Sequence, residues 1–144
     1  MQATDDPQVI DLLKAIVELE LSGVIRFTHY ALMVTGPNRI PQVEFFNGKA
    51  AESLQHAQRA GEILTGLGGH PSTKVAPVDE THQHSVEMIL EESYAHERVA
   101  IDQYTKLVEL CTGRNLFLEE YARSMVVAEE EDLMELRKMM RDLS

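Results

Sequence analysis

Two glutamates stand among apolar neighbours, where a solvent-facing charge is not expected. Glu20 lies in a stretch of valine, leucine and phenylalanine, and Glu97 lies in a similar stretch of alanine, isoleucine and tyrosine. Each is followed seven residues later by an aromatic residue, Phe27 in one case and Tyr104 in the other. A carboxylate that points into a dry core is costly unless it is paired or binds a metal ion. The repeat therefore predicts matching inward carboxylates on two helices.

Two further segments offer side chains of the same chemistry. Glu52 and His56 are four residues apart, and Glu129 and Asp132 are three apart in an acidic run that precedes an apolar residue. At about 100° per residue, Glu129 and Asp132 share one face of a helix. Taken singly, such a histidine is more often structural, and such an acidic run is more often a solvated surface. Because four segments each offer one or two of these groups, a shared metal site is the simplest joint explanation.

Hydrophobic periodicity places these residues on four long helices. Apolar residues recur with a period near 3.6 residues, and proline-containing starts and glycine-containing breaks bound each run. The sequence contains no strand alternation and no hairpin signal. The helices are expected to begin at Pro7, between Arg39 and Gln42, near Asp79 and near Asn115, and to end near Val34, Gly66, Leu110 and Asp142.

The connections between these helices predict the topology. The stretch from Gly66 to about Thr81 contains two prolines and is long enough for a crossover along a bundle. The other breaks are short and fit antiparallel hairpins. The expected fold is an all-α, single-domain four-helix bundle over residues 1–144, with one long crossover between the second and third helices.

The overall composition limits the partners that the protein can have. The 144 residues are 44% hydrophobic and carry a formal net charge of -11. This charge argues against nucleic acid, because phosphate binding needs a surplus of Lys and Arg. The single Cys111 cannot form an intrachain disulfide, and no apolar run reaches the ~18 residues of a membrane span. We therefore expect a cytoplasmic protein with no membrane partner.

Four stretches resemble the bacterioferritin branch of the ferritin-like family, over nearly the whole chain. They are ELSGVIRF with Glu20, ESLQHAQRAGEIL with His56, HERVAIDQY with Glu97 and AEEEDLMEL with Glu129. The family pattern is one glutamate from each of two helices and Glu-x-x-His from each of the other two. The resemblance implies a ferritin-like fold and a di-iron site that oxidises Fe²⁺ with oxygen or peroxide. It also implies a homo-dimer or larger homo-oligomer that serves iron storage or detoxification.

The chain departs from the family pattern in both Glu-x-x-His segments. Ser53 stands three residues before His56, and Asp132 stands three residues after Glu129, where the family has a histidine. The nearest carboxylate, Glu52, is displaced by about 100° around its helix unless a π-bulge turns it inward. The metal ligands that the resemblance implies are Glu20, Glu52, His56, Glu97, Glu129 and Asp132.

Other potential ligands carry less weight. The family's haem is held by a methionine two residues before the helical histidine, and that position is Leu54 here, so haem is not expected. The remaining histidines are interpreted as surface residues near the crossover or as ambiguous helical residues: His70, His82 and His84 in the first group, His29 and His96 in the second.

Two interpretations of the inward carboxylates stay open. In the first, they hold iron or another divalent metal and the protein is a ferroxidase. In the second, the metal site is degraded and the bundle is a non-catalytic assembly or interaction module. Its carboxylates would then be neutralised by basic side chains, which fill the space a metal needs: Arg26, Arg59, Arg98 or Lys106. A di-metal oxidase of organic substrates has no pocket signal in its favour.

Overall fold

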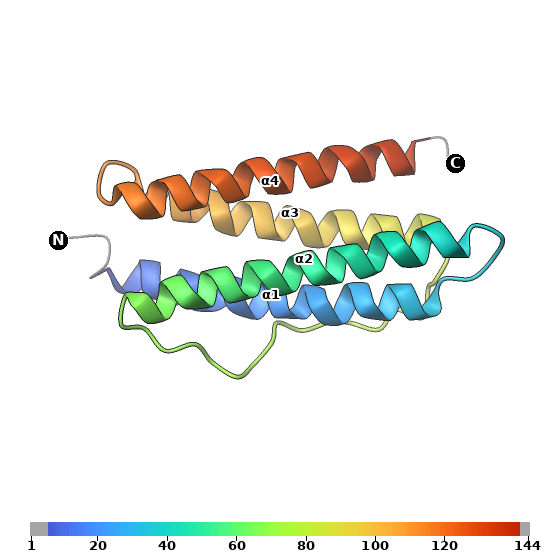
Figure 1. Ribbon diagram of the computed structural model, residues 1–144, viewed down its shortest axis with the longest axis horizontal. Helices are drawn as coiled ribbons and strands as arrows, with labels where there is room; N and C mark the ends of the chain where they lie inside the picture. The colour runs from blue at the N-terminus through green and yellow to red at the C-terminus, as the bar shows by residue number, and fades with distance from the viewer. Residues whose placement is uncertain (1–5, 142–144) are drawn as a thin grey trace.

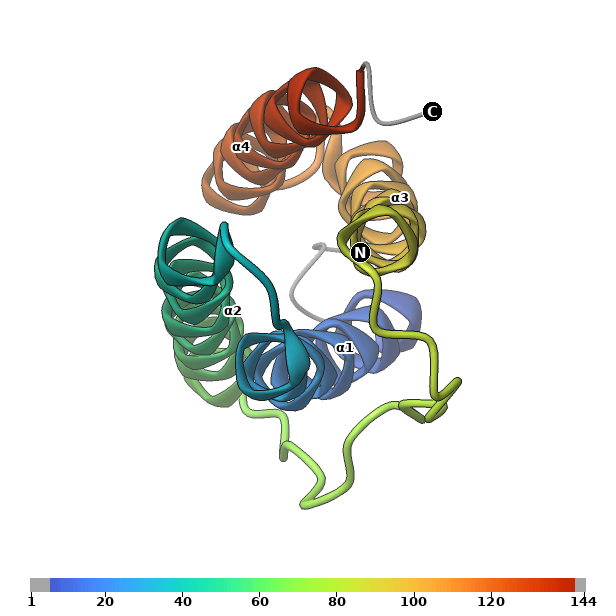
Figure 2. The same cartoon turned by 90° about the vertical axis from the view of Figure 1, so that its right-hand side faces the viewer.

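The computed structural model describes residues 6–141, which form four long helices and no strand. The helices are α1 (Pro7–Met33), α2 (Arg39–Gly66), α3 (Val86–Cys111) and α4 (Leu116–Met140). They lie side by side along the long axis of the molecule (Figure 1) and follow one another around the bundle as α1, α2, α4 and α3 (Figure 2). The prediction of an all-α four-helix bundle is confirmed.

Side-chain caps fix the starts of α1, α3 and α4. The Asp6 carboxylate accepts a hydrogen bond from the Gln8 amide at 2.8 Å, next to a proline in the first turn. The predicted start of the third helix near Asp79 is wrong, because α3 begins at Val86, after Ser85 as its cap. An α-helix cannot run through His82, whose φ is 58°. The predicted end of the fourth helix, Asp142, lies outside the described residues.

The segment 67–85 is the predicted crossover. Gly68 adopts a φ of 88° directly after α2, and the Gly69 amide donates to the Leu64 carbonyl at 2.9 Å, a helix-ending arrangement. The segment then runs along α1 (Figure 1), where the Ala76 amide donates to the Glu18 carbonyl at 3.1 Å. Because it spans the length of the bundle, α2 and α3 run in the same direction.

The buried apolar side chains form two clusters separated by a polar layer. One cluster includes Leu13, Leu107 and Leu118, and the other includes Phe27 and Leu133. Between them, about midway along every helix, lie buried polar side chains: Glu20, Ser22, Lys49, Ser53, Ser93, His96, Glu97 and Glu129. Apolar burial stabilises a bundle by about 25 cal/mol per Å², whereas burial of charged groups opposes folding unless they are paired. The polar layer therefore calls for a functional explanation.

None of the helices within residues 6–141 has both the length and the apolar stretch that crossing a bilayer requires.

Candidate metal centre

Glu20, His56 and Glu129 meet at the centre of the bundle, from α1, α2 and α4. His56 Nδ1 lies 3.1 Å from Glu20 Oε2 and 3.3 Å from Glu129 Oε1. The two glutamates are only 3% and 1% exposed. One potential ligand atom from each of the three residues lies within 4.8 Å of the others. This spacing suits a single cation held by two carboxylates and an imidazole.

Helix periodicity turns Glu129 inward and its neighbours outward. Met125 and Leu133, one turn before and one turn after it, are both buried, and residues four apart share one helix face. Glu131, in the same acidic run, is exposed. The acidic run is therefore partly the solvated surface that its composition suggests, and partly a buried carboxylate of the core.

Hydrogen bonds and ion pairs set the protonation of Tyr104, which borders this group, and of His56 within it. The Tyr104 hydroxyl donates to Glu20 Oε2 at 2.7 Å. Burial, together with the Glu20 carboxylate, raises the pKa of Tyr104 well above its usual value, so it remains a donor. Burial disfavours the charge on His56, but its contacts with Glu129 and Glu20 outweigh burial and raise its pKa to about 10.

One oxygen of the group has no partner. Glu129 Oε2 is buried and accepts no hydrogen bond from residues 6–141. A buried carboxylate oxygen left unpaired costs on the order of 1–3 kcal/mol, and such cases are rare in native structures. A cation bound at Glu129 would remove this cost.

Lys49 is the second cationic feature of the polar layer. Its ammonium Nζ lies 3.0 Å from Glu97 Oε1 and 3.4 Å from Asp132 Oδ2, and the side chain is only 7% exposed. Burial alone would lower the pKa of Lys49, but the carboxylates of Glu97, Asp132 and Glu52 raise it above its usual value. Lys49 therefore stays charged.

The Lys49 ammonium lies beside a second group of potential ligands. One oxygen each from Glu97, Glu129 and Asp132 lies within 4.8 Å of the others. Burial and the nearby Glu129 carboxylate raise the pKa of Glu97, while Lys49 opposes the rise. One ammonium thus does not neutralise this group, and Glu129 belongs to both groups.

Glu52 lies at the edge of the centre. Residues 39–66 form a continuous α-helix without a π-bulge, so Ser53 takes the inward position and Glu52 is turned aside. Its Oε1 is 3.8 Å from His56 Nε2, and its side chain is 36% exposed. Burial and the neighbouring Asp132 raise the pKa of Glu52.

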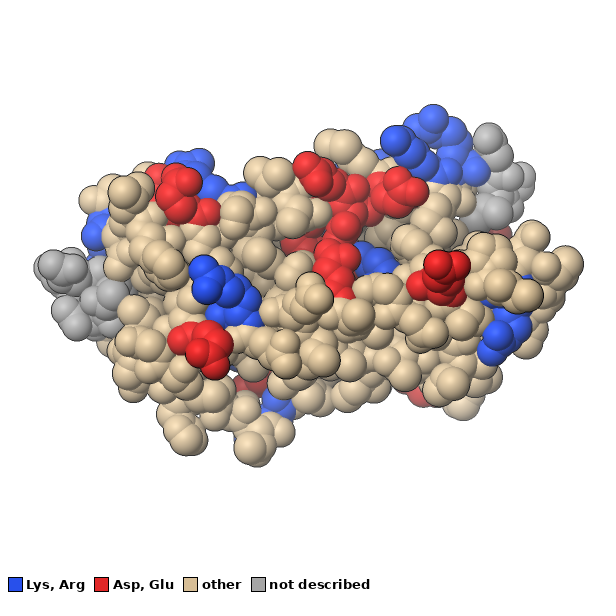
Figure 3. All heavy atoms as spheres, in the orientation of Figure 1, with Lys and Arg blue, Asp and Glu red and all other residues tan. Residues whose placement is uncertain are grey.

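A surface cleft leads to the polar layer between α2 and α4. The cleft has a volume of about 350 Å³, and both Lys49 and Asp132 line it, together with Glu52 and Glu135. Acidic side chains gather midway along this face, where α4 meets α2 (Figure 3). An acidic entrance attracts cations and raises their local concentration.

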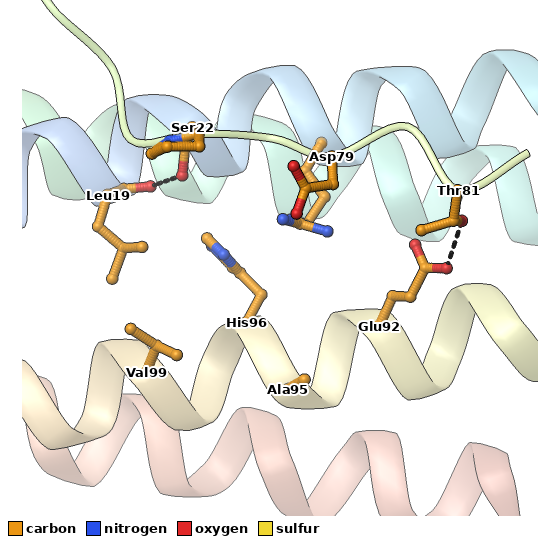
Figure 4. A pocket seen from close by; sticks show the side chains of 10 residues that line it. Leu19, Ser22, Asp79, Thr81, Glu92, Ala95, His96 and Val99 are labelled. Atoms are coloured by element: carbon orange, nitrogen blue, oxygen red, sulfur yellow. Dashed lines mark hydrogen bonds between the residues drawn. The ribbon is translucent and has the colours of Figure 1, made fainter.

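A separate cavity of about 380 Å³ lies between the crossover, α1 and α3 (Figure 4). His96 points into it from α3, and Thr81 on the crossover donates to Glu92 at 2.8 Å. Burial, followed by the positive charges of Arg26 and Lys49, lowers the pKa of His96 to about 4. His96 is therefore neutral, and it is not among the groups that gather around Glu129.

The structure brings five of the six sequence-predicted ligands together and leaves Glu52 at the edge. Of the basic residues that could have neutralised them, Arg98 and Lys106 are exposed, while Arg26 donates to Tyr30. Arg59 lies over aromatic rings. The cation that does pair with the carboxylates, Lys49, was missed. Its spacing was a usable signal, because it precedes Ser53 by four residues and His56 by seven.

The fold occurs in proteins of known structure. The sequence matches the Ferritin family, described as a ferritin-like domain, over residues 10–144. A ferritin-like, diiron-carboxylate protein from Bacillus anthracis str. Ames is 26% identical, with a TM-score of 0.87 over 93% of this chain and 96% of that chain.

Two further structures share the fold at lower identity. The dodecameric thioferritin from Bacteroides fragilis is 22% identical, with a TM-score of 0.84 over 94% of this chain and 86% of that chain. Rhodobacter capsulatus bacterioferritin is 21% identical, with a TM-score of 0.84 over 97% of this chain and 86% of that chain. No curated protein matches the sequence.

Proposed function

The chain belongs to the ferritin-like family, and from that premise we propose that it binds iron in the polar layer and oxidises Fe²⁺ to Fe³⁺. The observation that carries the proposal is the group of Glu20, His56 and Glu129, with the buried Glu129 Oε2 left without a partner among residues 6–141. Carboxylate and imidazole ligands together suit iron and other first-row divalent metals.

In the proposed reaction, the side chains of the polar layer bind and position the iron ions. Oxidation of two Fe²⁺ to two Fe³⁺ would supply two electrons, which together with two protons would reduce dioxygen to hydrogen peroxide, or hydrogen peroxide to two water molecules. Negative carboxylates favour Fe³⁺ over Fe²⁺. His56 has to lose its proton before it can bind a metal ion, and the Tyr104 hydroxyl keeps the Glu20 carboxylate oriented.

The two iron positions of the proposed di-iron site differ. The first is the group of Glu20, His56 and Glu129. The second is the group that includes Glu97 and Asp132, where the Lys49 ammonium now lies. A second iron binds only after Lys49 swings into the cleft between α2 and α4, which it already lines. The second iron therefore binds more weakly than the first.

The finer assignment is to the bacterioferritin branch, as a cytoplasmic homo-oligomer in iron storage or detoxification. The four sequence stretches that resemble bacterioferritins support it, and the fold is shared with a dodecameric thioferritin and a bacterioferritin. Haem is left out of the proposal, because Leu54 has no thioether to bind it.

A second candidate function is favoured by Lys49. A buried lysine paired with Glu97 and Asp132 can act as a permanent cation, so that the bundle needs no second metal and serves as a non-catalytic assembly module. The two candidates differ in what they take up, because a permanent cation leaves no room for stoichiometric di-iron binding.

The test is an anaerobic Fe²⁺ titration of the purified full chain, with metal content per chain measured before oxygen is admitted. Two irons per chain, the second weaker, with ferric absorbance that grows on aeration, is the expected result. No stoichiometric uptake and unchanged thermal stability would rule out the iron function and leave the assembly module.

A further inference from the structure

A second cluster of potential ligands lies on the surface, away from the polar layer. His29 comes from α1, whereas Glu80 and His84 come from the end of the crossover. His29 Nε2 is 2.5 Å from Glu80 Oε2, and His84 Nε2 is 3.3 Å from Glu80 Oε1. The two imidazole rings are 5.5 Å apart between centroids. Three side chains from two segments that are distant in sequence thus converge on one point.

The Nε2 atoms of His29 and His84 lack hydrogen-bond partners within the described residues. His29 Nε2 and His84 Nε2 are both hidden from solvent, and neither makes a hydrogen bond with any residue in the described range. Both lie within contact distance of the Glu80 carboxylate but without hydrogen-bond geometry toward it. Buried polar atoms are normally satisfied. A metal ion between the three side chains would satisfy both nitrogens at once.

The crossover is held in the conformation that presents Glu80 and His84. The His82 amide donates to Glu80 Oε1 at 2.7 Å, and His82 has a φ of 58°, a region that few non-glycine residues adopt. Beside it, the Thr81 hydroxyl donates to Glu92 on α3 at 2.8 Å. The ligand-bearing turn is thus anchored to the helix that follows it.

The donor set selects the class of cation. Two imidazoles and one carboxylate suit Zn²⁺ and other first-row divalent metals, whereas Ca²⁺ and Mg²⁺ prefer all-oxygen sites. One potential ligand atom from each of the three side chains lies within 4.8 Å of the others. A neighbouring cavity of about 190 Å³, also lined by His29 and Glu80, leaves room for water as a further ligand.

We propose that His29, Glu80 and His84 form a surface site for a divalent transition metal, which ties the crossover to α1. In this site α1 supplies one ligand, His29, and the crossover supplies the other two, Glu80 and His84. The site does not rest on the proposed iron chemistry of the bundle centre, with which it shares no residue.

The test uses the full chain with Glu20→Gln and Glu129→Gln, which removes two ligands of the central site. After treatment with a chelator, this variant is titrated with Zn²⁺ by calorimetry, and one Zn²⁺ per chain is expected to bind and to raise the melting temperature. Adding His84→Ala is expected to weaken binding by more than about tenfold, since even supporting residues of a metal site have effects of that size. The matched control is His70→Ala, an exposed crossover histidine outside the cluster, which is expected to change nothing.

Two outcomes would overturn the proposal. One is that the Glu20→Gln/Glu129→Gln variant binds no Zn²⁺, and the other is that adding His84→Ala leaves its affinity for Zn²⁺ unchanged. If that double variant does not fold, the wild-type chain and His84→Ala are titrated directly. Loss of one Zn²⁺ per chain in His84→Ala supports the site, and equal stoichiometry overturns it. Visible absorption of bound Co²⁺ that is lost in His84→Ala also supports the site, and unchanged absorption overturns it. Failure of iron oxidation at the bundle centre would leave all these readouts unaffected.

Discussion

Lys49 Nζ lies 3.0 Å from Glu97 Oε1, with both side chains buried in the centre of the bundle. The pair joins α2 to α3, and Asp132 extends it to α4 at 3.4 Å from the same ammonium. A cation that the chain itself supplies therefore stands among carboxylates that resemble a metal site. Its presence sets a limit on how many external cations the centre takes up.

Replacing Lys49 is expected to improve uptake of the second metal. Lys49→Met keeps the length and apolar character of the side chain but removes the charge, so that Glu97 and Asp132 become free to bind a cation. The affinity for the second Fe²⁺ or Co²⁺ should rise by at least about tenfold, or about 1.4 kcal/mol. Without added metal, the variant should be less stable by about 3 kcal/mol, because buried carboxylates lose their partner.

Anaerobic metal titration and urea unfolding measure the two effects of Lys49→Met. The matched control is Lys106→Met, since Lys106 is exposed on α3 and should change neither quantity. Unchanged metal stoichiometry together with unchanged stability would show that the Lys49 ion pairs have no energetic role.

Replacing Glu129 is expected to abolish metal binding at the centre. Glu129 belongs to both groups of potential ligands, so Glu129→Gln removes a ligand from each. Without added metal, the same change should destabilise the protein by about 1–3 kcal/mol, because the largely buried His56 loses one of the two carboxylates that it contacts.

Calorimetric metal titration and thermal unfolding are the measurements for Glu129→Gln. Glu131→Gln, in the same acidic run but exposed, is the control and should behave as wild type in both. Equal metal affinity in the two variants would contradict the central role of Glu129.

The neutral state of His96 predicts a loss of stability in acid. Its pKa is about 4 in the folded protein, below the ordinary value near 6.5. Because the unfolded chain binds a proton more readily, stability falls as the pH drops from about 6.5 towards 4, by about 3 kcal/mol in all. Above pH 7 the residue contributes no pH dependence.

Urea unfolding at several pH values, for wild type and for His96→Gln, isolates this contribution. The difference in unfolding free energy between the two proteins should shrink by about 3 kcal/mol between pH 7 and pH 4. His70→Gln, at an exposed position, should follow the wild type. A pH-independent difference would contradict the burial of neutral His96.

Replacing Gly23 is expected to destabilise the protein, although Gly23 lies in the middle of α1. A Cβ at this position would lie 2.7 Å from Ser53 Oγ and 3.0 Å from His96 Nε2, closer than van der Waals contact allows. Gly23→Ala should destabilise by about 1–3 kcal/mol, despite alanine's better helix propensity. Gly48→Ala, where a Cβ would meet nothing within 4 Å, should instead stabilise by up to about 1 kcal/mol. Thermal unfolding of both variants tests whether their stabilities change in opposite directions. A gain in stability in Gly23→Ala would contradict the close packing of α1 on α2.

The helices were predictable because long amphipathic periods leave little ambiguity. The start of α3 was not, because Asp79 near a proline looks like a helix start, whereas Ser85 is the residue that caps the helix. Residue type alone does not reveal that His82 adopts a left-handed conformation. The helical period of apolar residues therefore predicts the body of a helix better than it predicts where the helix begins or ends.

The inward carboxylates could be predicted from their apolar neighbours, whereas the spacing of Lys49 from Ser53 and His56 indicates only the helix face that it shares with them. A lysine side chain is long enough to reach water or core from the same backbone position, so the direction taken by Lys49 depends on tertiary packing. The surface cluster was missed for a related reason. His29 and His84 are 55 residues apart, and only the path of the crossover brings them together.

The polar layer affects the order in which the helices of the bundle separate on unfolding. The backbones of α1 and α2 pack closely, as do those of α3 and α4, whereas within the described chain α2 and α4 approach each other far less. The two hairpins therefore meet along a seam whose middle is held by charges rather than by apolar packing, through His56 with Glu129 and Lys49 with Asp132. If the centre binds metal as proposed, we expect the two hairpins to unfold together with metal bound, and α2 and α4 to separate before the hairpins unfold when a chelator removes it.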